Sequence, residues 1–341
     1  MPSPPLNRPI HRTRRLVWGF LRFAIGIGLL IYLTKSGVID LATFRKLFRS
    51  WPVSLAAIAL IGVDVLMMSL RLSWLLEPHR LHLPLGKSLQ LTFVSFFFTT
   101  FLPGSSGGIL AKVFYAAREN EGRRVEIAAV VIFDRAIGLL SLLLLSLVFV
   151  PVFWHLVWSV AELRFLALTA ALLTIGLVGG VTVILLDQSW AHRLLRRVLE
   201  WLPWKELPRR TIDAISFYRG SPGTLLASLG ASLLANFSVI CVAALALFAL
   251  APQSFASRVF LVAPMGYIAN NIPLTPGGLG IGEEAFSALF RLTGLGGGAD
   301  ALLCWRIWSL PASAVGLVCY LRGLGRSVQR RENASVPHGE T

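Results

Sequence analysis

The chain has 341 residues, of which 55% are hydrophobic and only 14% are charged, and its mean hydropathy is +0.70. Soluble domains carry about 25% charged residues, and the apolar residues here form long runs, which excludes a soluble enzyme or binding domain and predicts a polytopic α-helical membrane protein. The formal net charge of +15 is expected to mark cytoplasmic loops, and no soluble basic module is present that would bind nucleic acid.

The N-terminal region begins with a basic segment, residues 1–15, which precedes the apolar run Leu16–Leu33. No small-x-small cleavage site follows this run, so we expect an uncleaved first span with the N-terminus in the cytoplasm. Residues 40–50 then show the pattern of an amphipathic interfacial helix. The basic residues of this segment conflict with the topology predicted below, which places the segment outside the cell.

Five further apolar stretches are long enough to cross the membrane, since about 20 helical residues span the hydrocarbon layer. They are Pro52–Leu76, Val125–Val150, Phe165–Leu186, Thr224–Leu250 and Ala299–Leu321. With the N-terminal run they make six full spans. Asp64 lies in the middle of the first of these five, and its role stays open. Arg71, near the end of the same stretch, is interpreted as reaching the cytoplasmic edge by snorkelling.

The polar connections predict the topology. The largest of them, residues 187–222, is strongly basic, too small to be a catalytic domain, and expected in the cytoplasm together with both termini. The tail, residues 324–341, is expected to be disordered. These features predict a multi-pass protein of the cell inner or plasma membrane.

Two other apolar stretches are interrupted by proline and glycine. Ser88–Phe101 ends at Pro103-Gly104-Ser105-Ser106-Gly107, and Ala263–Arg291 contains Pro276-Gly277-Gly278-Leu279-Gly280. A helix as short as the first rises only about 21 Å, so each stretch is expected to enter the membrane, turn and return. Broken backbone is tolerated at membrane depth only where protein or a water-filled cavity satisfies it.

The two interrupted stretches also predict an inverted repeat. Each carries P-G-x-x-G and is followed by a span with an arginine, Arg135 in the first case and Arg306 in the second. The spans before them run in opposite directions, so the halves, about 52–150 and 224–321, have the hydropathy pattern of an inverted repeat. If the turns meet near the middle of the bilayer, the helix N-termini after them would face one polar cavity and attract an anion such as phosphate.

Several residues of these stretches have a structural and a functional interpretation. The prolines and glycines serve turn geometry or line the cavity, and Asn270 and Asn271 satisfy the broken backbone or line the path. Glu283 compensates the helix dipole, pairs with Arg306, meets a cationic headgroup or carries a coupling proton. Asp134 and its neighbour Arg135 project about 100° apart, so they are expected to face different partners.

The pattern as a whole resembles a known family. The matching residues are Phe101-Leu102-Pro103-Gly104, Gly107-Gly108, Asp134-Arg135, Gly138-Leu139, Pro273-Leu274-Thr275-Pro276-Gly277-Gly278-Leu279-Gly280, Glu283 and Arg306, with Arg71 and Trp74 fitting after the early span. Over about residues 16–323 the chain resembles the flippase-like membrane domain of bacterial lysylphosphatidylglycerol synthases (the multiple peptide resistance factors) and their stand-alone relatives.

The resemblance implies a protein that moves or handles phospholipids or related polar lipids, with two re-entrant hairpins at its centre. The sequence departs from the family pattern at three places. Ile109 stands where relatives often have an acidic residue, Lys112 where they commonly have arginine, and Thr99 and Thr100 where they often have asparagine. No segment of domain size follows Arg331, so the aminoacyl-transferring activity is not implied.

Together these arguments give a set of candidate headgroup-binding residues and no catalytic residue. The set is Pro103, Gly104, Gly107, Gly108, Lys112, Asp134, Arg135, Asn270, Asn271, Pro276, Gly277, Gly278, Gly280, Glu283 and Arg306. No metal or cofactor is expected, because the cysteines and histidines lack the spacing of metal ligands.

The leading hypothesis is a non-enzymatic translocator of an anionic or aminoacylated phospholipid, a polyprenyl-linked lipid or another polar lipid. Two alternatives stay open: a membrane-embedded transferase acting on lipid-linked substrates, and an accessory subunit of a lipid-modifying system. A homo-oligomer or a lipid-modifying enzyme is the expected protein partner.

Overall fold

The computed structural model describes residues 50–81, 83–101, 106–120, 123–186, 215–250, 257–271 and 280–334. All of them belong to one unit of the chain, Leu47–Thr341. Over these ranges the chain forms helices and turns without any strand, which confirms the all-α class. The expected first span at 16–33, nearly all of the interfacial helix at 40–50 and most of the basic loop at 187–222 lie outside the described residues.

Five helices in these ranges are long and apolar enough to cross a membrane. They are α3 (Trp51–Leu76), α6 (Arg124–Val148), α8 (Ala161–Leu186), α11 (Pro222–Leu250) and α14 (Gly298–Ala334). All five spans expected after the N-terminal one are therefore confirmed. Pro52 and Pro222 lie in the first turns of α3 and α11, where the missing N–H of proline costs no helical hydrogen bond.

Helix α14 extends to Ala334, beyond the expected end of the span at Leu321. Its last turns belong to the segment 324–341, for which we expected disorder. They are rich in arginine, glutamine and glutamate, which are good helix formers, and the next proline in the sequence is Pro337.

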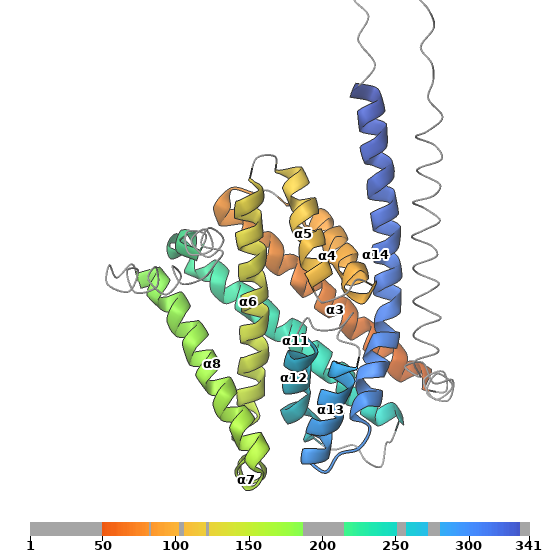
Figure 1. Cartoon of the computed structure of the whole chain (residues 1–341). Helices are drawn as coiled ribbons and strands as arrows, with labels where there is room; N and C mark the ends of the chain where they lie inside the picture. Colours follow the sequence, from red (N-terminus) through yellow and green to blue (C-terminus); the bar gives the residue numbers. More distant parts are fainter. Residues whose placement is uncertain are drawn as a thin grey trace, which may run out of the picture. The chain divides into compact units, whose positions relative to one another are not determined.

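Four shorter helices form two helical hairpins. Helix α4 (Leu85–Phe101) packs on α5 (Ser106–Glu119), and α12 (Val259–Asn270) packs on α13 (Ile281–Leu292). At 1.5 Å per residue even the longest of them rises only about 25 Å. The hairpins approach from opposite ends of the bundle, and the closed end of each points toward its middle (Figure 1).

Each hairpin contains a glycine where its two arms touch. A Cβ on Gly108 of α5 would lie 2.8 Å from the carbonyl oxygen of Ser95 on α4, and a Cβ on Gly266 of α12 would lie 2.6 Å from the ring of Phe286 on α13. Because real Cβ atoms do not approach other heavy atoms so closely, both contacts require glycine. The two hairpins thus use the same device to bring their arms together.

The two halves of the chain are packed into one another. Helices α3 and α11 pack against each other along most of their length and run in opposite directions (Figure 1). Helix α4 of the first half packs on α14 of the second, and α12 of the second half packs on α6 of the first. Each hairpin is therefore held by the last long helix of the other half, an exchange that agrees with the predicted repeat.

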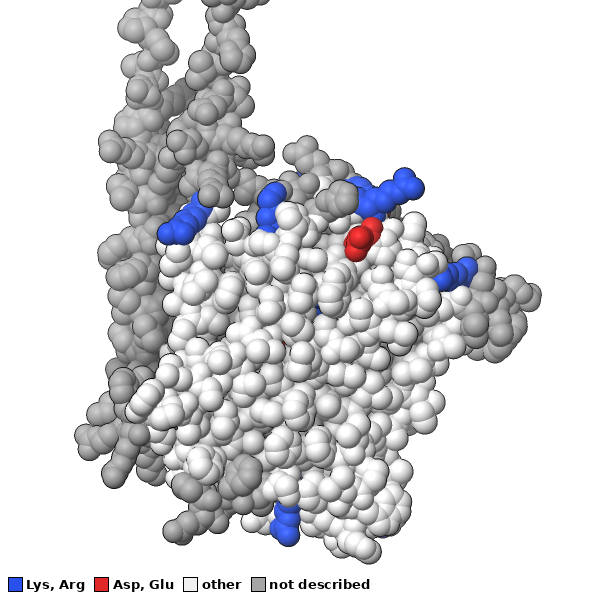
Figure 2. All heavy atoms as spheres, turned by 180° about the vertical axis from the view of Figure 1, so that it is seen from behind, with Lys and Arg blue, Asp and Glu red and all other residues white. Residues whose placement is uncertain are grey.

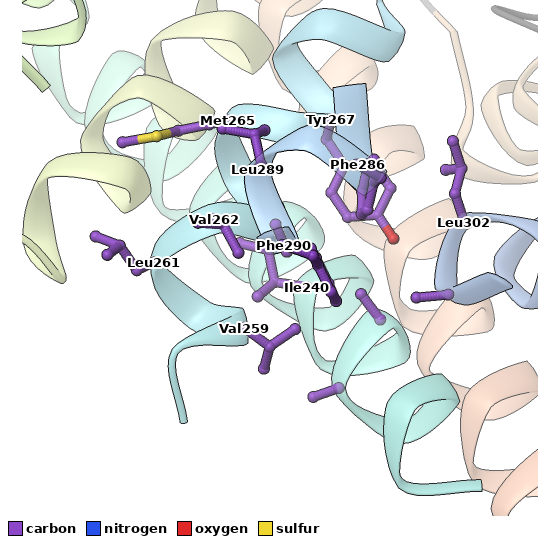
Figure 3. Close-up of a cluster of buried hydrophobic side chains, with 14 of the residues drawn as sticks. Ile240, Val259, Leu261, Val262, Met265, Tyr267, Phe286, Leu289, Phe290 and Leu302 are labelled. Atoms are coloured by element: carbon purple, nitrogen blue, oxygen red, sulfur yellow. The ribbon is translucent and has the colours of Figure 1, made fainter. Parts of the chain in front are cut away.

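A large apolar cluster joins α11, α12, α13 and α14 around the second hairpin. Figure 3 shows Val262 and Tyr267 of α12 facing Phe286 and Phe290 of α13, with Ile240 of α11 beside them. The rings of Tyr267 and Phe286 meet edge to face at a centroid distance of 5.0 Å, the arrangement that aromatic quadrupoles favour. This packing fixes the second hairpin on the long helices.

The edge of the bundle is made by α7 (Trp154–Ser159) and α8. Trp154 and Trp158 stack at 3.9 Å, while α8 is largely exposed and apolar, with Phe165, Leu172 and Ile175 each more than two-thirds exposed. Figure 2 shows a broad uncharged band on one face, with basic and acidic side chains at the upper end and a basic side chain at the lower end. Such a band suits contact with lipid hydrocarbon.

A connection near the first hairpin is also fixed by specific contacts. The 3-10 helix η1 (Glu77–His79) follows α3, and η2 (Phe217–Gly220) precedes α11. The Tyr218 hydroxyl donates to the carbonyl of Leu75 at 2.5 Å, and Arg219 donates twice to the carbonyl of Ile184. Burial raises the pKa of the Tyr218 phenol, so it remains a donor throughout the physiological range.

Candidate functional site

A buried ion cluster lies inside the bundle between α3, α5, α6 and α11. Arg71 Nε donates to Asp134 Oδ1 at 2.5 Å, and Lys112 Nζ lies 3.7 Å from Asp134 Oδ2. Arg71 Nη1 also donates to the hydroxyl of Ser232 at 2.7 Å. Arg71, Lys112 and Asp134 are at most 5% exposed. We call these residues with Ser232 the Asp134 cluster.

The expectation for Arg71 was wrong. Its side chain does not reach the cytoplasmic edge but is 3% exposed and bonded to two other helices. The physical reason is the carboxylate of Asp134, since two opposite charges inside a membrane are far less costly as a pair than alone. The signal in the sequence was the presence of opposite charges in two separate spans.

A second polar cluster lies at the closed end of the second hairpin. Arg306 of α14 donates through Nε to Glu283 Oε1 at 2.8 Å and through Nη2 to Asn270 Oδ1 at 3.1 Å. Arg135 of α6 donates through Nη2 to Asn271 Oδ1 at 2.9 Å. We call Arg135, Asn270, Asn271, Glu283 and Arg306 the tip cluster. It joins both arms of the hairpin to the last long helix of each half.

Glu283 has two partners in this cluster. Besides Arg306, its Oε2 accepts the backbone N–H of Gly280, 2.8 Å away, at the start of α13. Gly280 has φ = 82°, a conformation that glycine adopts without strain. The side chain of Glu283 therefore satisfies a free N–H group of its own helix. The pairing with Arg306 confirms one of the interpretations of Glu283.

The expected anion site at the N-terminus of α13 thus already contains an anion. The carboxylate of Glu283 lies between that N-terminus and Arg306. Helix α5, which follows the first turn, has no acidic residue in its first turn. The two hairpins are alike in form and unlike in charge.

Arg135 differs from the other buried cations of the two clusters. In the described part of the chain it has no carboxylate within 4 Å, and its hydrogen-bond partner, the side-chain oxygen of Asn271, is neutral. Asp134, although adjacent in sequence, pairs with Arg71 and Lys112, as expected for neighbours that project in different directions. Arg135 is half-buried, and among the described residues it is a cation without a contacting partner of opposite charge.

The closed ends of the hairpins lie against the middle parts of long helices. Asn271, just after α12, contacts Arg135 near the centre of α6. Thr100, near the end of α4, lies 3.1 Å, hydroxyl to hydroxyl, from Ser313 within α14. Asn236 of α11 donates to the carbonyl of Gly138, about one turn after Arg135 on α6, at 3.1 Å. Polar groups from several elements therefore gather at the level where the hairpins end.

The structure brings most described site candidates together. Lys112 and Asp134 lie in the Asp134 cluster, and Arg135, Asn270, Asn271, Glu283 and Arg306 form the tip cluster, while Gly107, Gly108 and Gly280 lie at the starts of α5 and α13. Pro103, Gly104, Pro276, Gly277 and Gly278 lie outside the described residues. Sequence reasoning missed Ser232, a serine among many in a charge-free span with nothing in its pattern to single it out.

Comparison with known proteins gives one match. A family model described as the lysylphosphatidylglycerol synthase TM region matches residues 19–316. No curated protein and no solved structure matches the chain. The matched range includes every residue of the two clusters.

Proposed function

The chain belongs to the family of lysylphosphatidylglycerol synthase transmembrane regions, and from this we propose that it binds a phospholipid or related polar lipid by its headgroup and moves it across the membrane between the two hairpins. The lipid is anionic or aminoacylated, or carries another phosphate headgroup such as a polyprenyl phosphate. It leaves chemically unchanged, so the protein acts as a translocator and not as an enzyme.

The observation that carries the proposal is the charge of Arg135. A guanidinium inside a membrane span is costly unless it has a counter-charge, and the described residues supply Arg135 with a neutral amide only. A phosphate would provide the missing negative charge and accept two parallel hydrogen bonds from the guanidinium. Each such charge-assisted bond contributes about 1.5–3 kcal/mol.

The arrangement of the hairpins supports a path for the headgroup. Hairpins that enter from opposite ends and stop beside the middle of α6 and α14 have the form of re-entrant segments in transporters with repeated halves. Polar groups at that level lower the cost of a headgroup inside the bilayer. The apolar acyl chains would stay in the surrounding lipid.

The orientation follows from the exposed charges. Arg80, Lys87, Arg124 and Arg219 are exposed at the end where α3 finishes and α4 begins. The same end carries the acids Glu77 and Glu126, fewer than its cations, whereas at the opposite end exposed arginines such as Arg291 are matched by acids such as Glu284. By the rule that cytoplasmic loops are basic, this difference supports a cytoplasmic position for the first end and, with the predicted span at 16–33, for both termini, in the cell inner or plasma membrane.

Transport by the purified protein in vesicles tests the proposal. Vesicles contain a fluorescent phosphatidylglycerol in both leaflets, and dithionite in the outside solution bleaches only the lipid that reaches the outer leaflet. We expect the wild-type protein to expose the inner-leaflet lipid and Arg135→Gln to slow this by about tenfold or more, since about 1.4 kcal/mol corresponds to a factor of ten. Mass spectrometry of the lipid is expected to recover it unchanged.

The matched control is Arg291→Gln, which removes an arginine from an exposed ion pair with Glu284 and is expected to transport at the wild-type rate. If the wild-type protein transports no anionic, aminoacylated or polyprenyl-linked lipid, the translocator proposal is wrong. A chemically altered lipid would instead favour the transferase.

A further inference from the structure

Asp64 is a buried carboxylate that neither cluster uses. It lies in the middle of α3 and is 6% exposed. Among the described residues it has no hydrogen-bond partner and no cation within 4 Å. Within the described ranges Asp64 is therefore a buried carboxylate without a contacting counter-charge, and a small part of its surface remains exposed.

The charges around Asp64 come from several elements. Arg71 of α3 and Lys112 of α5 attract its negative charge, although neither lies within 4 Å of it. The phenol of Tyr267 on α12 is also close enough to interact with this charge. Both cations make their close contacts with Asp134 of α6. Helix α11 has no charged residue, α4 has only Lys87 at its start, and Arg306 of α14 is paired with Glu283.

The charge state of Asp64 consequently depends on the rest of the site. An ionised carboxylate that is buried without a hydrogen bond or a contacting cation is costly, and binding a proton removes that cost. Only the positive potential of Arg71 and Lys112 supports the ionised form. Anything that lowers this potential shifts the balance toward the protonated form.

We propose that Asp64 takes up one proton when an anionic headgroup binds at Arg135, so that anion and proton occupy the protein together. The inference rests on the proposed function. The anion adds a negative charge to the interior and draws the nearby cations toward itself, which removes the support of the ionised carboxylate. A proton from the aqueous phase then forms an O–H bond with Asp64, and it returns to water when the anion leaves.

Thermodynamic linkage fixes the sign of the effect. If the anion favours protonated Asp64, then protonated Asp64 favours the anion by the same factor. The affinity for the anion therefore rises as the pH falls through the range in which Asp64 titrates, by at most about tenfold per pH unit for one proton. A proton gradient would in this way bias the direction of transport.

The test measures protons during binding. Dioctanoyl phosphatidylglycerol is titrated into the purified full-length protein by calorimetry at about pH 6, 7 and 8, in pairs of buffers that differ in ionisation enthalpy. We expect the wild-type protein to take up a fraction of a proton, up to one, per bound lipid. Asp64→Asn is expected to bind the same lipid without proton uptake and with an affinity independent of pH.

A second arm uses glycerophosphoglycerol, which keeps the singly charged phosphodiester of the lipid but has no acyl chains. Proton uptake with both probes would show that the anion alone triggers protonation, and uptake with the lipid only would show that the headgroup must be delivered by its chains. Both results support the role of Asp64. Asp64→Glu is expected to keep the uptake, and Glu284→Gln, which changes an exposed carboxylate, is the matched control.

Two results would overturn the inference. One is lipid binding by the wild-type protein without proton uptake at any of these pH values, and this result does not depend on any variant folding. The other is undiminished uptake in Asp64→Asn. If the wild-type protein binds neither the lipid nor glycerophosphoglycerol, the proposed function itself fails, so the two failures are distinguishable.

Discussion

The buried charged side chains fall into two groups, those that contact a side chain of opposite charge and those that do not. Asp134 compensates Arg71 and Lys112, and Glu283 compensates Arg306. Arg135 and Asp64 remain without a contacting partner of opposite charge in the described ranges. The paired groups hold helices together, while the unpaired ones are available to a ligand and to a proton.

Asp134 is expected to be essential for folding. Asp134→Asn would leave two buried cations without a counter-charge, which destabilises proteins by about 3–5 kcal/mol. Thermal unfolding in detergent should show a large decrease in the melting temperature. Glu126→Gln is the control, because Glu126 pairs with Arg123 while 45% exposed, and such pairs contribute about 0–1 kcal/mol. Equal effects of both substitutions would show that the Asp134 cluster does not hold the bundle together.

Glu283 is expected to compete with a bound anion. Glu283→Gln would remove the carboxylate that lies between Arg306 and the start of α13, which lowers stability by about 0.5–2 kcal/mol through the weakened cap. The same change removes the carboxylate that competes with a phosphate for Arg306 and the helix N-terminus. Titration with dioctanoyl phosphatidylglycerol should therefore show a higher affinity in a less stable protein. Lower affinity, with Glu284→Gln unchanged, would instead indicate that Glu283 itself holds the lipid.

At the scale of the helices, the close approach of α14 to α4 anchors the first hairpin. A Cβ on Gly316 would lie 2.1 Å from the carbonyl oxygen of Phe93, and backbone cannot give way as a flexible side chain does. We expect Gly316→Ala to separate the helices and cost about 1–3 kcal/mol, measured as a lower melting temperature. Gly62→Ala is the control within a long helix, because nothing lies within 4 Å of its added Cβ. Equal melting temperatures for Gly316→Ala and wild type would show that this contact is not tight.

The long helices could be predicted from the sequence because an apolar run of more than 20 residues has few alternatives to a span. The hairpins were predictable for a similar reason, since α4 and α12 are too short to cross and are followed by proline and glycine. Partners across the bundle were harder to predict. The pairing of Arg306 with Glu283 joins neighbouring elements and was anticipated, whereas that of Arg71 with Asp134 depends on how α3 packs against α6.

At the scale of the whole molecule, the exchange of hairpins between the halves explains why the two clusters adjoin. Because α12 packs on α6, the tip of the second hairpin meets Arg135, the neighbour of Asp134 in the first-half cluster. A change in the position of one hairpin would therefore alter contacts made by both halves. This coupling is what alternating access between repeats requires.

The topology of the hairpins gives the last prediction. In a variant without Cys241, Cys304 and Cys319, single cysteines replace Lys87 or Asn120, which flank the first hairpin, and Ser257 or Arg291, which flank the second. If both hairpins are re-entrant, the flanks of each lie on the same side of the membrane, so a membrane-impermeant maleimide applied to intact cells should label positions 257 and 291 and spare 87 and 120. Labelling after permeabilisation should reach all four. A helix of α12's length spans only about 18 Å, so we do not expect either hairpin to cross the membrane. If the two flanks of one hairpin are labelled from opposite sides, that hairpin does cross, and the proposed path between two re-entrant hairpins is wrong.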